Sequence, residues 1–288
     1  MGAGEDQGTK NRSGITPSTT TQNMKNTTQF LPGNPTHNAE ATPWKRDRLN
    51  NYQDLVLKPE FAERKLRFQT GETWLRILPA FQTSVHGWML GVHALEFDGG
   101  HFAHPRTLMR NAKSVFDHAY TWALANKPDS LYSKTNKAGV RLLTNPLGVF
   151  WALIEENGKT VARLFVGSAY DGSRGGTPGL AWQVWHLTQQ KDENDNLIAN
   201  PAHPDEGVLI CVEKTQAAGA KYPSYRLQLG RQKARITDSI AKMEPGEFDA
   251  LVPLEKTIRV LTPDEEWECL GKVMSPETAG IIKNSVVK

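Results

Sequence analysis

The chain has 288 residues, of which 38% are hydrophobic and 23% charged, and its formal net charge is +3. This composition predicts a folded protein of one large domain with appendages or two small domains, and no apolar run reaches the ~18 residues of a membrane span. The two cysteines are far apart and the N-terminus has no signal-peptide core, which excludes a disulfide scaffold and predicts a cytoplasmic protein.

Three regions follow one another along the chain. Residues 1–43 are rich in Thr, Asn, Gly, Ser and Pro and contain one aromatic residue, so they predict a disordered N-terminal arm. Residues 44–236 predict the folded core, with an insertion at 101–138. Residues 237–288 predict an acidic C-terminal segment, helical or irregular in pieces, with a net charge of −4 over 238–288.

The core predicts short strands interrupted by a helix. Alternation of Trp74 and Arg76 with Leu75 and Ile77 predicts a strand with one dry face. Further strands are predicted at 88–97, 139–144, 149–154, 160–166, 207–214 and 224–229, a helix at 107–126, and a strand or helix at 182–187. Asn145-Pro146 separates two of the strands, and Asn157-Gly158 predicts a hairpin turn. The fold class is therefore mainly β with helical insertions, a partly open barrel of five strands.

Aromatic and basic residues alternate in two segments that contain few acids. Residues 101–141 carry a net charge of +5, and residues 214–235 carry +6 with no acid. Unpaired nucleic acid needs cations for its phosphates and flat rings for its bases. The predicted phosphate contacts are Arg76, Arg106, Arg110, Lys134, Lys137, Arg141, Lys214, Lys221 and Arg226, and the predicted stacking residues are Trp74, Tyr132, Tyr222 and Tyr225. Trp122, Trp151 and Trp185 are predicted to lie in the core.

No enzyme signature is recognisable. The glycine-rich stretch at 167–179 lacks the phosphate-binding patterns Gly-x-x-x-x-Gly-Lys-Ser/Thr and Gly-x-Gly-x-x-Gly, and no Gly-x-Ser-x-Gly occurs. We therefore predict no catalytic residue and no cofactor. Histidines gather between His86 and His118, and zinc held by His101, His104 and His118 is the alternative, as in a metal-dependent nuclease. A second alternative is a structural or assembly protein in which the N-terminal arm clasps a neighbouring subunit.

Several motifs, in order, resemble the single-stranded-DNA-binding proteins of T4-type phages. Arg76-Ile77-Leu78-Pro79 resembles the family's opening strand, Phe102-Ala103-His104-Pro105 the approach to its metal-binding subdomain, and the run from Glu206 to Tyr225 its late hairpin. The resemblance spans about residues 66–235. It implies an OB-fold that holds single-stranded DNA, self-association along the DNA, a role in replication, recombination and repair in the host cytoplasm, and contacts of the acidic C-terminal segment with replication proteins. The family's zinc cysteines are absent here.

Overall fold

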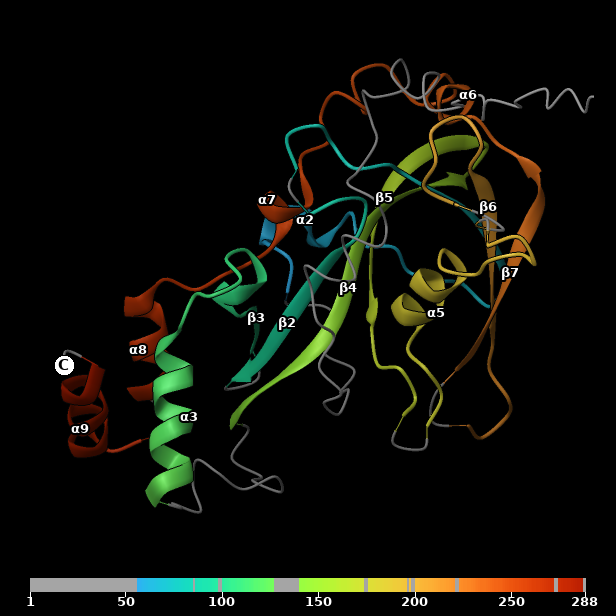
Figure 1. Cartoon of the computed structure of the whole chain (residues 1–288). Coiled ribbons are helices and arrows are strands. Elements are labelled where there is room, and N and C mark those ends of the chain that lie inside the picture. Colours follow the sequence, from blue (N-terminus) through green and yellow to red (C-terminus); the bar gives the residue numbers. More distant parts are fainter. Residues whose placement is uncertain are drawn as a thin grey trace, which may run out of the picture.

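The computed structural model describes residues 56–84, 86–97, 100–126, 140–173, 176–195, 197, 200–220, 223–271 and 274–286, some of them by backbone alone. The predicted N-terminal arm lies outside these residues, as do residues 127–138 of the predicted insertion. Within the described part the protein is mainly β with several helices (Figure 1). No helix in these ranges is long and apolar enough to cross a lipid bilayer.

One antiparallel sheet contains all the strands of the described ranges. They are β1 (Gly71–Ile77), β2 (Leu90–Phe97), β3 (Gly100–Ala103), β4 (Val140–Glu156), β5 (Lys159–Ser168), β6 (Val208–Thr215) and β7 (Ser224–Lys233). Their order is β3-β2-β4-β1-β6-β7, and β5 pairs with the other edge of β4. The sheet curves strongly, so that β4, β5, β6 and β7 surround a helix, α5 (Leu180–Leu187) (Figure 1).

Strand β4 is one long strand where the sequence predicted two. It runs through Asn145-Pro146, and Pro146 lies opposite His93 of β2. Proline has no N–H to donate to the His93 carbonyl, but that carbonyl instead accepts a hydrogen bond from the His104 N–H at 2.8 Å. Because the His93 carbonyl receives its hydrogen bond from a residue outside the β2–β4 pair, Pro146 does not end the strand.

The Asn157-Gly158 hairpin is confirmed. Both residues have positive φ, 52° and 76°, and they connect β4 to β5 with Glu156 opposite Lys159. A two-residue turn with two positive φ values matches the twist of the flanking strands, and Asn-Gly is the sequence that adopts it most easily.

The helices of the described residues are short. They are α2 (Pro59–Ala62), the 3-10 helix η1 (Pro105–Thr107), α3 (Val115–Asn126), α5, α6 (Ile236–Ile240), α7 (Leu254–Thr257), α8 (Pro263–Gly271) and α9 (Pro276–Val286). Helix α3 begins later than the predicted residue 107. Ser114 caps it: its N–H donates to Asp117 Oδ2 at 3.0 Å and its Oγ accepts from the Asp117 N–H at 3.3 Å, which is a capping box.

Both faces of β4 and β5 are buried. Phe150 and Ala152 point toward α5 and pack in a cluster with its buried residues Ala181 and Val184. The opposite face, which includes Trp151, packs against Ile236 of α6 and against Leu251, Leu254 and Ile258 of the C-terminal segment. The predicted core position of Trp151 is therefore confirmed, and the C-terminal segment is an integral part of the fold.

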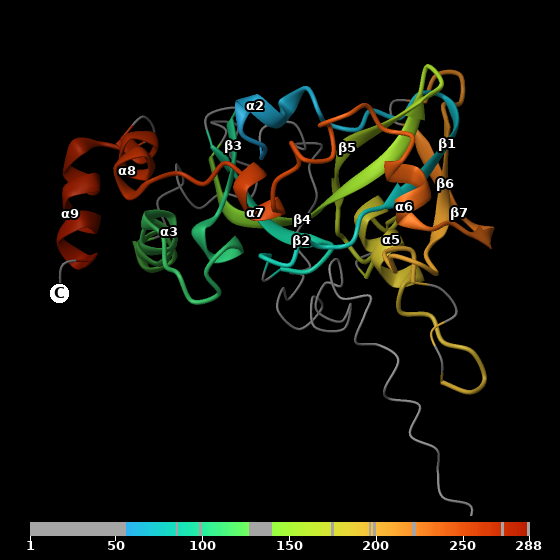
Figure 2. The ribbon, with the colours of Figure 1, turned by 90° about the horizontal axis from the view of Figure 1, so that it is seen from above.

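A third cluster joins α3, α8 and α9 to the end of β2 and to β3. Phe116 and Ala119 of α3 pack with Leu270 of α8 and Ile282 of α9. Figure 2 shows these three helices side by side at the end of the molecule opposite β6 and β7.

Candidate nucleic-acid interface

Arg76 was predicted to contact phosphate, and the structure corrects this. Its side chain is 1% exposed. Its guanidinium donates to backbone carbonyls of Ala234 (2.8 Å), Ile77 (2.9 Å), Pro204 (3.3 Å), Pro201 and His203. Burial lowers the pKa of Arg76 to about 10, an effect that Asp205 opposes, so the group stays charged at neutral pH. Arg76 thus fastens the 201–204 loop and the end of β7 to β1, and it has no free donors to offer a phosphate.

Trp74 lies on the outer face of the sheet and is 44% exposed. It pairs with Cys211 of β6, which in turn pairs with Gln228 of β7, so these three side chains share one face. Two positions away on the same face are Glu72 and Glu213, and the Trp74 Nε1 donates to Glu72 Oε2 at 3.3 Å. Carboxylates therefore flank the exposed indole on its own strand and the next.

Tyr225 and Lys214 lie on the opposite face from Trp74. They are paired across β6 and β7, and both engage Phe68: the rings of Tyr225 and Phe68 meet edge to face at 6.0 Å, and Lys214 Nζ donates to the Phe68 carbonyl at 2.9 Å. Burial raises the pKa of the Tyr225 hydroxyl. The two predicted stacking residues Trp74 and Tyr225 therefore do not line one groove, because strand alternation places them on opposite sides of the sheet.

The other predicted contacts are divided. Arg110 is exposed in the turn before α3, and Arg106 is half-buried in η1, so both lie at the α3 end of the molecule. Arg226 is exposed on β7. The predicted contacts Tyr132, Lys134, Lys137, Lys221 and Tyr222 lie outside the described residues, as does the side chain of Arg141.

The histidine cluster has a structural role at His104. This side chain is 1% exposed; its Nδ1 accepts from the Arg106 N–H at 3.0 Å, and its Nε2 lies 2.8 Å from Asp117 Oδ2 and 3.0 Å from Ser114 Oγ. Burial by itself raises the pKa of Asp117, but the hydrogen bonds from His104 and Ser114 outweigh it and lower that pKa. Since both ring nitrogens are engaged, His104 does not fit the zinc ligand of the alternative prediction.

His118 is half-buried on α3, and the side chain of His101 is outside the described part. Among the described residues no group of three or more His, Cys, Asp or Glu side chains is placed to hold a metal ion.

An open pocket between α5 and β7 brings together rings that the sequence did not link. Its volume is about 320 Å³, and it is lined by Trp182, Gln183, His186, Leu187, Tyr225, Arg226 and Leu227. The rings of Trp182 and His186 are stacked, with centroids 4.7 Å apart and planes 9° from parallel. The sequence left 182–187 open between strand and helix, and only the helical alternative, through its i,i+4 spacing, places these two residues on one face. We call this feature the α5–β7 pocket.

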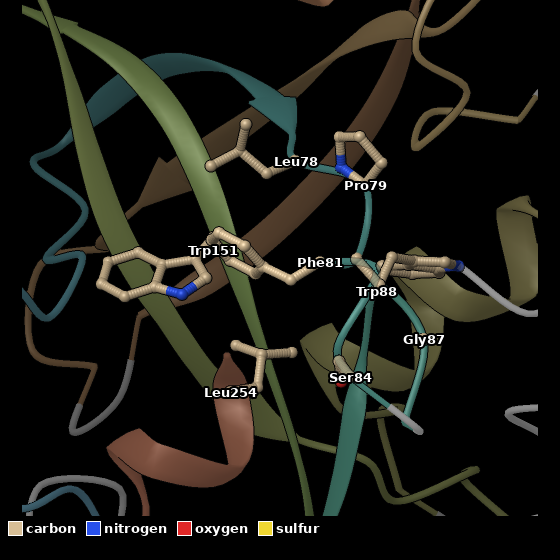
Figure 3. Close-up of a pocket in the computed structure, with 9 residues that line it drawn as sticks. Leu78, Pro79, Phe81, Ser84, Gly87, Trp88, Trp151 and Leu254 are labelled. Atoms are coloured by element: carbon tan, nitrogen blue, oxygen red, sulfur yellow. The ribbon is translucent and has the colours of Figure 1, made fainter. Parts of the chain in front are cut away.

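A second cavity, beside Trp151, is too small for a ligand (Figure 3). It measures about 10 Å³ and is lined mainly by apolar side chains such as Leu78, Phe81 and Leu254. That volume holds one water molecule at most. The Trp151 Nε1 donates to the Val252 carbonyl at 2.9 Å, so the indole is anchored to the C-terminal segment.

Comparison of the sequence with protein-family models and with curated proteins found no match.

Proposed function

We propose that the chain binds single-stranded DNA with little sequence preference, as a protein that coats unpaired strands during replication or recombination. The observation that carries the proposal is the strand pairing. β1 pairs with β4 and β6, β4 pairs with β5, and β6 pairs with β7, while α5 lies between β5 and β6 in the chain. With β2 and β3 set aside as additions, the remaining strands follow in the order β1, β4, β5, β6 and β7, with α5 between the third and the fourth. This order supports an OB-fold, a five-stranded partly open barrel that commonly binds oligonucleotides.

The usual DNA-binding face of such a barrel is covered here. OB-folds bind mainly over their second and third strands, which correspond to β4 and β5. The outer faces of β4 and β5 pack against Leu251, Leu254 and Ile258 of the C-terminal segment. The loop between the last two strands is the other usual contact region, and here it corresponds to residues 216–223. We therefore assign the interface to β7 and this loop.

The charge of this region supports the assignment. Arg226, Arg231 and Lys233 of β7 and Arg235 just after it are all exposed. Lys233 forms an ion pair with Glu206 at 3.1 Å. Residues 214–235 contain no acid, and on the neighbouring strand Glu213 lies opposite Arg226. Arginine side chains that face water beside a ring-lined pocket are suited to hold the phosphates of a strand whose bases enter that pocket.

A titration with oligo-dT, followed by tryptophan fluorescence at several salt concentrations, tests the proposal. If about 4–6 phosphates are contacted, log K should fall against log salt with a slope of about −3 to −4. Absence of binding at low salt, or an affinity that does not depend on salt, would overturn the proposal.

A charge-matched pair of variants locates the interface. R226Q/R231Q removes two bases from β7, and K242Q/K283Q removes two exposed bases from α9 and the region after α6. The β7 variant should reduce the magnitude of the salt slope by about 1.4, at ~0.7 per phosphate, and the control should leave it unchanged. An equal effect of both variants would contradict the assignment to β7.

A further inference from the structure

We propose that the α5–β7 pocket receives one unpaired base of the bound strand, which stacks on the aromatic pair of Trp182 and His186. This inference rests on the proposed function and specifies where a base is held. The pocket volume of about 320 Å³ is at the lower end of the range of small-ligand sites and is ample for a single nucleobase.

Helix α5 holds the aromatic pair in a fixed orientation. Its Ala181 and Val184 are 0% exposed and anchor it inside the curved sheet, so Trp182 and His186 lie on the side of the helix that faces the pocket. The two rings are already parallel. A base that stacks on them therefore meets a preformed surface and loses little free energy to side-chain ordering.

Polar groups suited to the edge of a base line the same pocket. The Gln183 Nε2 donates to the Pro178 carbonyl at 2.7 Å, which fixes the amide, and no described residue donates to its Oε1. This oxygen can accept a hydrogen bond from the N–H of a base. β7 is the last strand of the sheet in the described ranges, so its outer edge presents backbone donors and acceptors that no neighbouring strand there engages.

The charges on the two faces of the sheet differ. Arg226 is exposed and borders the pocket next to Tyr225, but it pairs with Glu213 of β6, so its side chain leaves β7 on the face that Trp74 shares. On that face Trp74 is flanked by Glu72 and Glu213, and Arg226 offsets only one of these two negative charges. Among the described residues no acidic side chain lines the α5–β7 pocket, and this difference favours the pocket over Trp74 as the place where a ring meets DNA.

The test compares W182L with W74L, since each removes one indole that is at least partly exposed from one face of the sheet. The removal of one stacked base should weaken oligo-dT binding by W182L by roughly 5- to 100-fold, while W74L should stay within about twofold of the wild type. The salt slope of W182L should equal that of the wild type, because no phosphate contact is lost. Circular dichroism checks that both variants are folded.

A strand without bases provides the second arm. W182L and the wild type should bind an abasic deoxyribose-phosphate strand equally, because that strand has nothing to stack. H186A, which removes an exposed ring, should weaken oligo-dT binding in the same direction as W182L and serves if W182L does not fold.

The outcomes separate the two proposals. If the wild type binds oligo-dT and neither W182L nor H186A changes that affinity, the pocket assignment is overturned and the proposed function stands. A wild type that binds no oligo-dT would overturn both.

Discussion

The guanidinium of Arg76 occupies the space directly in front of the Gly207 backbone, where the Cβ of any other residue would collide with it. The arginine cannot withdraw, because its donors are committed to carbonyls of the 201–204 loop and of Ala234. Gly207 is needed for close approach between a loop and a buried cation.

Gly207→Ala should therefore lower the free energy of unfolding by about 1–3 kcal/mol, as expected for overpacking in a rigid interior. Urea denaturation followed by tryptophan fluorescence measures the change. Gly271→Ala is the control, since a Cβ there meets nothing within 4 Å. Equal stability of the two variants would contradict the contact.

The C-terminal segment is expected to be indispensable for stability. Leu254 is 3% exposed in the cluster that covers β4 and β5. Leu254→Ala should lower the free energy of unfolding by about 2–5 kcal/mol, because it removes buried methyl groups and leaves a cavity. The matched change Leu197→Ala, at a side chain 43% exposed, should cost less than about 0.5 kcal/mol. A small effect at Leu254 would indicate a tail that is only loosely attached.

Glu266 should make stability fall as pH rises. Its side chain is 2% exposed, its Oε2 accepts from the Val115 N–H at 2.7 Å, and burial raises its pKa to about 7 despite that hydrogen bond. An acid with a raised pKa in the folded state holds its proton there more tightly than in the unfolded chain. Between about pH 4.5 and 7 unfolding therefore releases a proton, and the stabilisation from this proton is lost across that window.

The measurement is urea denaturation at pH 5, 6, 7 and 8. The wild type should lose about 1–3 kcal/mol of unfolding free energy from this group over the range. Glu266→Gln should flatten the profile, whereas Glu268→Gln, at an exposed position on the same helix, should not. Parallel profiles for the wild type and Glu266→Gln would refute the assignment.

The β4–β5 turn should be sensitive to loss of its glycine. Gly158 has a φ of 76°, in the left-handed region. Gly158→Ala should cost about 1–2 kcal/mol, because a Cβ is strained there even though nothing crowds it. Gly280→Ala within α9, also uncrowded, should instead raise stability by about 0.5–1 kcal/mol, since alanine is the better helix former. Equal effects at both glycines would show that backbone conformation does not decide them.

Local sequence patterns predicted the strands and the hairpin turn better than they predicted which distant segments pack against them. Alternation located β1, and the strands predicted at 207–214 and 224–229 correspond to β6 and β7. The Asn157-Gly158 turn was recognised because the backbone conformation it requires is set by these two residues alone. The division of β4 at Pro146 was wrong, since the acceptor left without a donor is satisfied by His104, which is remote in sequence. The start of α3 was misplaced because the cap at Ser114 was not recognised.

The sequence by itself determined that Trp74 and Arg76 share a strand face and that residues 214–235 are basic, because both are properties of neighbouring residues. The tertiary structure decided that Arg76 is covered while Trp74 is exposed, and that Trp182 and Tyr225 line one pocket. Coverage depends on which distant segment packs over a side chain, here a loop more than a hundred residues away. Strand alternation determines on which face of the sheet a side chain lies, whereas its burial depends on tertiary packing that no local sequence pattern encodes.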